Sequence, residues 1–271
     1  MQSLEADLAA ARDLNTADLA DAIETIGFEC TRCGACCKAE TCGDGAEAEE
    51  DGDGEAAAGN GEPEPHTATV FPDEVRDLQA ATAASDEFDR EYDWRDVARP
   101  MPYGLHEGPE GEEGETFEWA LRTDSCGDCT FYREAADGTG ACSVHGSRPL
   151  ICRTYPFSVV LDGAVKGDDS EGPSGAGTEL AQPMGAAVDR EGAVRAHECE
   201  GLGLDISRAD AEDLAAALKE RAVRELEEAI AVRDRYEPVG TGPGEVVVHD
   251  SEGAKRPDGA PLGGRDDPGS E

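Results

Sequence analysis

Four cysteines lie within eight residues near the start of the chain, at Cys30, Cys33, Cys36 and Cys37. Cysteines separated by two residues can direct both sulfurs to one cation because a tight turn brings them to the same side, and Gly34 can adopt the positive φ that such a turn often needs. Neighbouring cysteines this close bridge poorly to one another. A thiolate-bound metal is the favoured interpretation, and disulfides or buried unreactive thiols are the alternatives.

The composition limits how much of the chain can pack into a core. Its 271 residues include 62 acidic and 23 basic side chains, which gives a net charge of −39, and only 5% are aromatic. Self-repulsion at this charge would strain a compact state unless salt screens it, so the composition is typical of a halophile's protein. The same field disfavours nonspecific binding to nucleic acid or to an anionic membrane.

No targeting signal is recognisable at the start of the sequence. Residues 1–22 carry acidic side chains throughout, and the chain has no apolar run of about 18 residues that could cross a membrane. We therefore expect a cytoplasmic protein. In that reducing compartment, ten cysteines are better explained by metal binding or redox chemistry than by a disulfide framework.

The pattern of apolar and turn residues predicts an α+β fold, a small irregular cysteine-rich domain with short strands and hairpins. Asn15 is the expected N-cap of a helix that ends at Gly27, Pro72 is expected to begin another, and Ser207 to cap the longest one. The predicted organisation is an N-terminal helical segment at 1–27, a cysteine-cluster domain at 28–42 and 66–201, and a C-terminal helix packed on it at 207–236.

Two further segments are rich in glycine, proline and acidic residues. They cannot bury enough apolar surface to offset the entropy of ordering, so 43–65 is predicted to be a disordered acidic insertion and 240–271 a disordered tail, despite the short run Val246 to Val248. Residues 101–115 are predicted to be a loop for their glycines and prolines.

Several short motifs together resemble the YkgJ-type CxxCxxCC cysteine-cluster proteins. They are the block from Cys30 to Cys37, Cys129-x-Phe131, Gly140-x-Cys142, Arg148-Pro149, Cys152-Arg153 and Pro156-Phe157. The resemblance covers roughly residues 28–201 and implies a zinc- or iron-chelating domain. Cys42 and Cys126 lie outside the shared set, and His145-Gly146 stand where the family usually has an aromatic residue followed by an acid.

Eight cysteines form the predicted ligand set: Cys30, Cys33, Cys36, Cys37, Cys129, Cys142, Cys152 and Cys199. This number suffices for two four-thiolate sites or for one site plus a redox pair. Adjacent side chains usually diverge, so Cys36 and Cys37 should serve different sites, or only one of them should bind. Zn²⁺ and iron–sulfur clusters both accept four cysteines, and the spacing does not separate them.

Four charged or titratable residues lie close to these cysteines in sequence. Arg148 and Arg153 flank Cys152 and are predicted to favour its thiolate and to offset the charge of a bound cofactor, with ordinary ion pairs as the alternative. His145 and His197 could be ligands or could support ligands, although a solvated or hydrogen-bonded structural role is favoured for both.

The leading functional hypothesis is an iron–sulfur or zinc protein in electron transfer, metal handling or metallocentre assembly, with a redox or client protein as partner. A second is an enzyme, either a cluster-dependent oxidoreductase or, because the cysteine pattern is similar to that of flagellin lysine methylases, a protein lysine N-methylase. A third is a structural zinc module that scaffolds a protein partner. The sequence has no phosphate-binding glycine motif, nucleophile elbow or HExxH, so catalysis has little support.

Overall fold

The computed structural model describes residues 3–39, 67–161, 178–181, 187–189 and 192–262. These residues form helices and several small sheets, which confirms the predicted α+β class. The predicted insertion at 43–65, together with Cys42, lies outside the described residues. No helix in the described ranges has an apolar stretch of the length that a bilayer requires.

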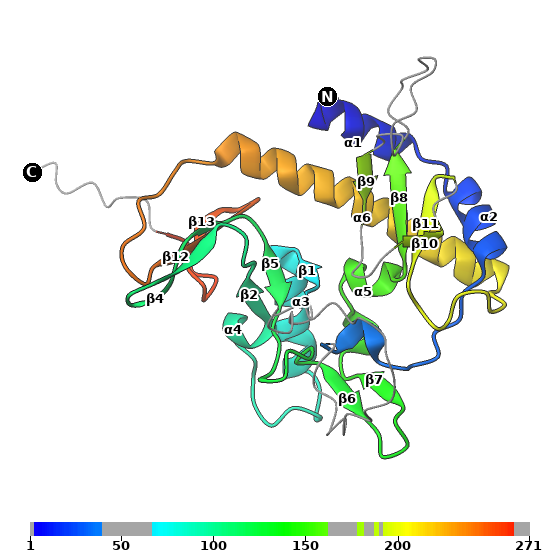
Figure 1. Cartoon of the computed structure of the whole chain (residues 1–271), viewed down its shortest axis with the longest axis horizontal. Helices are drawn as coiled ribbons and strands as arrows, with labels where there is room; N and C mark the ends of the chain where they lie inside the picture. Colours follow the sequence, from blue (N-terminus) through cyan, green and yellow to red (C-terminus); the bar gives the residue numbers. More distant parts are fainter. Residues whose placement is uncertain (1–2, 40–66, 162–177, 182–186, 190–191, 263–271) are drawn as a thin grey trace, which may run out of the picture.

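The long helix α6 (Arg208–Arg235) runs along the whole body of the molecule (Figure 1). It begins where predicted, because the hydroxyl oxygen of Ser207 accepts a hydrogen bond from the backbone N–H of Asp210 at 3.1 Å. It packs against α2 (Thr16–Ile26) and, through Glu227 and Arg233 in its second half, against α1 (Leu4–Asp13), and it also contacts a sheet near its C-terminal end. This one helix therefore joins two separate cores.

The first core lies between α1, α2 and α6 and an antiparallel sheet. The sheet has the strand order β10 (Ala187–Asp189), β11 (Val194–His197), β8 (Phe157–Leu161) and β9 (Thr178–Leu180). Ile23, Phe157 and Leu218 are fully buried there. Asn15 caps α2 by accepting from the N–H of Ala17 at 2.9 Å, as predicted.

The second core is built around a small antiparallel sheet and contains cysteine side chains. Its elements are β1 (Thr69–Val70), β5 (Trp119–Leu121) and β2 (Ala98–Pro100) in that order, with α3 (Pro72–Ala83), α4 (Trp94–Val97), α5 (Leu150–Thr154) and the hairpin of β6 (Tyr132–Glu134) and β7 (Gly140–Cys142). Cys129 and Phe131 are buried among these elements. Cysteine side chains and apolar side chains therefore share one interior.

The C-terminal region corrects one prediction. Residues 246–255, predicted to be part of a disordered tail, form β12 (Val246–Asp250) and β13 (Gly253–Lys255). The tail prediction is wrong there because β12 pairs in parallel with β4 (Gly111–Thr116), a strand far back along the chain, and this pairing buries Val247 and Val248 completely.

The partner of β12 belongs to a hairpin in the segment predicted to be a loop. There β3 (Leu105–Gly108) pairs antiparallel with β4 around a two-residue turn. The loop prediction failed because the glycines and acidic side chains of this hairpin hide the strand pattern, while backbone pairing with β12 supplies the order.

Candidate metal centre

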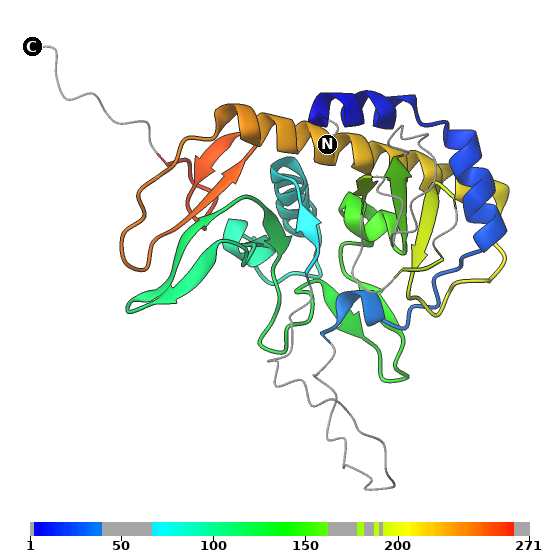
Figure 2. The same ribbon diagram turned by 45° about the horizontal axis from the view of Figure 1, so that its top comes forward.

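The first cysteine segment leaves α2 at Gly27 and ends in the short 3₁₀ turn η1 (Ala35–Cys37), beside α5 and the β6–β7 hairpin (Figures 1 and 2). Gly34 has a φ of +81°, which confirms the positive φ predicted from the sequence. A Cβ atom at this position would also lie 2.3 Å from the hydroxyl oxygen of Tyr132. Only glycine therefore allows the turn to approach the hairpin this closely.

Four thiols from four parts of the chain gather on the second core, and we call them the inner group: Cys37, Cys129, Cys142 and Cys152. The backbone N–H of Cys129 donates a hydrogen bond to the carbonyl oxygen of Cys37 at 2.8 Å, so two distant cysteine segments are in direct contact. Cys142 lies on β7 opposite Tyr132, and Cys152 lies in the middle of α5. All four side chains pack in or against the second core.

The electrostatics of the inner group reflect how close its members are. Burial, together with a negative charge on Cys142, raises the pKa of Cys129 to about 12. Burial also raises the pKa of Cys152 well above its usual value, and Cys129 and Cys142 add to the effect. Several thiolates can exist together in such a place only if a cation compensates their charges.

The other four predicted ligands form a second set, the outer group: Cys30, Cys33, Cys36 and Cys199. The chain near Cys199 is joined to the first segment by a hydrogen bond from the N–H of Glu29 to the carbonyl oxygen of Gly201 at 3.0 Å. Burial raises the pKa of Cys199, and charges on Cys33, Cys36 and Cys30 raise it further. Cys30 and Cys36 are exposed, whereas Cys33 and Cys199 are half-buried.

Cys36 and Cys37 lie where the two groups meet. Their sulfur atoms are 3.8 Å apart, far beyond the roughly 2.05 Å of a disulfide bond, and the nine cysteines among the described residues are all free thiols. A hydrogen bond from Cys37 lowers the pKa of Cys36 to about 7. The same contact, together with burial, raises the pKa of Cys37, so one proton is shared unequally between the pair.

The two arginines that flank Cys152 in sequence differ in their effect on the thiols. Arg148 lies close enough to the thiols that its charge counteracts the rise in pKa that burial causes at Cys142 and Cys152. Arg153 is exposed, and its side chain makes no hydrogen bond or ion pair within the described part of the chain. The geometry therefore offers support for the predicted role of Arg148 and none for that of Arg153.

The two histidines and Cys126 are outside the two thiol groups, each in different surroundings. His197 is buried in the first core, where its Nε2 lies 3.0 Å from the hydroxyl oxygen of Ser158. His145 is exposed beside Arg148, whose positive charge lowers the pKa of the imidazole. Cys126 is exposed at the tip of its turn. The hydrogen-bonded role favoured for His197 agrees with its position.

The donor atoms present suit a soft or borderline metal. Thiolates bind Zn²⁺ and iron–sulfur clusters, whereas Mg²⁺ and Ca²⁺ require oxygen ligands, so the residues fit the first two. As the side chains stand, no three Cys, His, Asp or Glu residues within the described ranges converge closely enough to hold a metal ion. The thiols of each group therefore lie in the same region without forming a ready-made site. Metal binding requires their side chains to turn toward a common centre.

Comparison with protein families gives a match over residues 29–200, to a family described as CxxCxxCC, "Putative zinc- or iron-chelating domain". The chain belongs to the CxxCxxCC family. The matched range includes every member of the inner and outer groups, and it supports metal binding as the property of this domain. Comparison of the chain with curated proteins and with solved structures finds no match.

Two residues support the cysteines of this CxxCxxCC domain and were not identified from the sequence. Tyr132 packs against Gly34 and donates a hydrogen bond to a carboxylate oxygen of Glu134 at 2.6 Å. Glu74 accepts a hydrogen bond from the N–H of Leu150 at 2.8 Å and so anchors the start of α5, which carries Cys152. Tyr132 could have been suspected from its place three residues after Cys129, but nothing near Glu74 in the sequence signals its contact.

Proposed function

We propose that the chain binds metal in two adjacent four-thiolate sites, one formed by the inner group and the other by the outer group. The observation that carries the proposal is the contact between the N–H of Cys129 and the carbonyl oxygen of Cys37, since it brings together cysteines about ninety residues apart. The pKa of Cys152 is raised by Cys129 and Cys142, that of Cys37 by Cys129 and Cys152, and that of Cys199 by Cys33 and Cys30. These effects agree with the division into two groups, and Cys36 acts on both.

The proposed cofactor is an iron–sulfur cluster or Zn²⁺, held by the thiolates and partly neutralised by Arg148. An iron–sulfur cluster would supply one-electron redox chemistry, whereas zinc in a closed four-cysteine site would supply stability. We propose a role in electron transfer, metal handling or metallocentre assembly, with a redox or client protein as partner. A reducing cytoplasm with high salt is the setting that would keep the thiols reduced and screen the net charge of −39.

Metal analysis and visible spectroscopy of the full chain, purified anaerobically in high salt, test this proposal. Iron and inorganic sulfide with a visible absorbance that bleaches on reduction would support the electron carrier. A colourless protein with zinc would support metal handling or a structural module, and two zinc ions per chain would support the division into two sites. A folded protein that retains no metal after reconstitution with either would overturn the proposal.

A further inference from the structure

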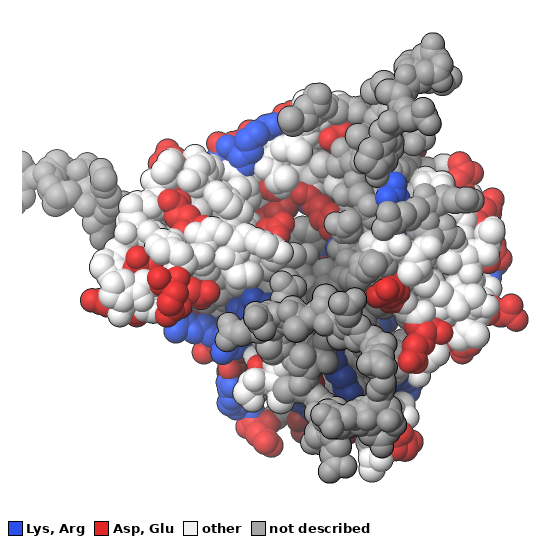
Figure 3. Space-filling model, in the orientation of Figure 1, with Lys and Arg blue, Asp and Glu red and all other residues white. Residues whose placement is uncertain are grey.

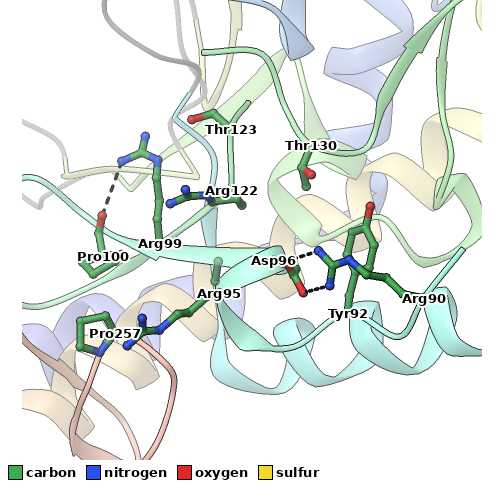
Figure 4. Close-up of a pocket in the computed structure, with 11 residues that line it drawn as sticks. Arg90, Tyr92, Arg95, Asp96, Arg99, Pro100, Arg122, Thr123, Thr130 and Pro257 are labelled. Atoms are coloured by element: carbon green, nitrogen blue, oxygen red, sulfur yellow. Dashed lines mark hydrogen bonds and ion pairs between the residues drawn. The ribbon is translucent and has the colours of Figure 1, made fainter. Parts of the chain in front are cut away.

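Four arginines line one polar cavity of about 470 Å³ beside the second core: Arg90, Arg95, Arg99 and Arg122. The cavity lies between α4, β2 and the segment that follows β5 (Figure 4). Figure 3 shows basic side chains gathered over α4 and β2 on a face where acidic side chains are common elsewhere. In a chain with a net charge of −39, this gathering of positive charge calls for a local explanation.

One of the four arginines is already neutralised. The guanidinium of Arg90 donates two hydrogen bonds of 2.5 Å to the two carboxylate oxygens of Asp96. Among the described residues that line the cavity, Asp96 is the only acidic one, and this bidentate pair occupies both of its oxygens. The described lining therefore offers no second carboxylate to Arg122.

Arg99 and Arg122 extend side by side from neighbouring strands (Figure 4), because Arg99 on β2 pairs with Ala120 and Arg122 directly follows β5. Burial lowers the pKa of Arg99, and the positive charge of Arg122 lowers it further. Arg99 also donates to the hydroxyl oxygen of Thr67 at 3.1 Å. In the described part of the chain, the guanidinium of Arg122 makes no hydrogen bond or ion pair.

The cavity adjoins the inner group. The backbone N–H of Thr130 donates to the carbonyl oxygen of Arg122 at 2.9 Å, and Thr123 forms an antiparallel bridge with Cys129. Both threonines line the cavity, which adds two side-chain hydroxyl groups to the arginines. On the other side, the ion pair of Arg95 with Asp258 is long, at 3.8 Å.

We propose that this cavity binds a small oxyanion with two or more negative charges, of the phosphoryl or carboxylate type, next to the inner group. An anion between Arg99 and Arg122 would remove their mutual repulsion, and guanidinium groups bind the oxygens of either anion in pairs. The volume of the cavity falls in the range of small-molecule sites. The proposed anion site is formed by the arginines alone, so the proposal does not depend on which metal the cysteines bind.

Isothermal titration of the full-length protein with pyrophosphate and with citrate tests the site. Ionic strength is held constant with KCl, so that screening does not change between titrations. The variant is Arg122→Gln, whose side chain holds no other residue in place, and the matched control is Arg12→Gln, which removes the same charge from an exposed ion pair with Glu227 on α6. Arg122→Lys keeps the charge and removes the paired donors.

We expect at least one of the two anions to bind, with affinity falling about 10-fold or more in Arg122→Gln, as for other charge-assisted hydrogen bonds, and staying unchanged in Arg12→Gln. Arg122→Lys should fall between the two. Binding of pyrophosphate alone would identify a phosphoryl ligand, and binding of citrate alone a carboxylate ligand. Absence of binding by both anions, or equal losses in Arg122→Gln and Arg12→Gln, would overturn the proposal.

Discussion

The inner and outer groups are joined at Cys36 and Cys37, yet their surroundings differ. Cys129 of the inner group is only 7% exposed and packs with Phe131 in the second core. Among the described residues, no member of the outer group belongs to either core. Cys30, Cys33 and Cys199 lie instead on loops joined by the hydrogen bond between Glu29 and Gly201, and Cys36 lies in η1.

This difference indicates that the cysteine side chains have two different roles in the molecule. Inner thiols that are also core residues link metal binding to folding, because their thiolates are tolerated in the interior only with a cation present. Outer thiols can join the first segment to the chain near Cys199 without being needed for the core.

The largest effect should come from serine at an inner position. Because structural zinc sites contribute roughly 10 kcal/mol or more to folding, Cys152→Ser should lose the inner metal and fail to fold or melt far below the parent protein. Cys30→Ser, an exposed member of the outer group, should lose part of the metal and keep the fold. Metal analysis and thermal melting followed by circular dichroism measure both, and equal melting of the two variants would remove the distinction.

Substitution of Gly34 should rank second, because this glycine brings both groups together. Gly34→Ala introduces a Cβ atom 2.3 Å from the Tyr132 hydroxyl oxygen at a φ of +81°. Gly138→Ala is the matched control, since Gly138 has a φ of +83° and an added Cβ there meets nothing within 4 Å. The control should lose about 1–2 kcal/mol of unfolding free energy from backbone strain alone. Gly34→Ala should lose more, because its added Cβ also meets Tyr132. Similar losses in chemical denaturation would show that the contact with Tyr132 is unimportant.

Gly201→Ala should affect the outer group alone. The added Cβ would lie 2.1 Å from the carbonyl oxygen of Glu29 and so separate the two loops, whereas at Gly146 an added Cβ meets nothing within 4 Å. We expect Gly201→Ala to lose about 1–3 kcal/mol and the metal of the outer group, while Gly146→Ala keeps both. Full metal content in Gly201→Ala would show that the outer group does not depend on this contact.

The smallest effect is on thiol reactivity in the metal-free protein. The lowered pKa of Cys36, about 7, means that its reactive thiolate becomes populated as pH rises through neutrality, whereas Cys129, with a pKa of about 12, stays protonated. Alkylation followed by peptide mass spectrometry at pH 6 to 9 should therefore label Cys36 well before Cys129. Earlier labelling of Cys129 would contradict its buried position in the inner group.

Helices were predictable wherever local signals agreed. The caps at Asn15 and Ser207 and the start at Pro72 lie where apolar periodicity and capping chemistry indicate them. Strands were less predictable, because β12 depends on a partner about 130 residues earlier and its flanking glycines and acids are typical of disorder. The domain organisation beyond these elements stays a prediction.

The sequence by itself determined that this is an α+β chain of the CxxCxxCC family with a dense set of cysteines, because motif spacing and helix caps are local properties. Only the tertiary structure decided which thiols lie near one another, that the charge of Arg148 acts on Cys142 and Cys152, and that four arginines meet at one cavity. These facts depend on contacts between residues far apart in the chain, which backbone pairing and burial establish and which no local pattern contains.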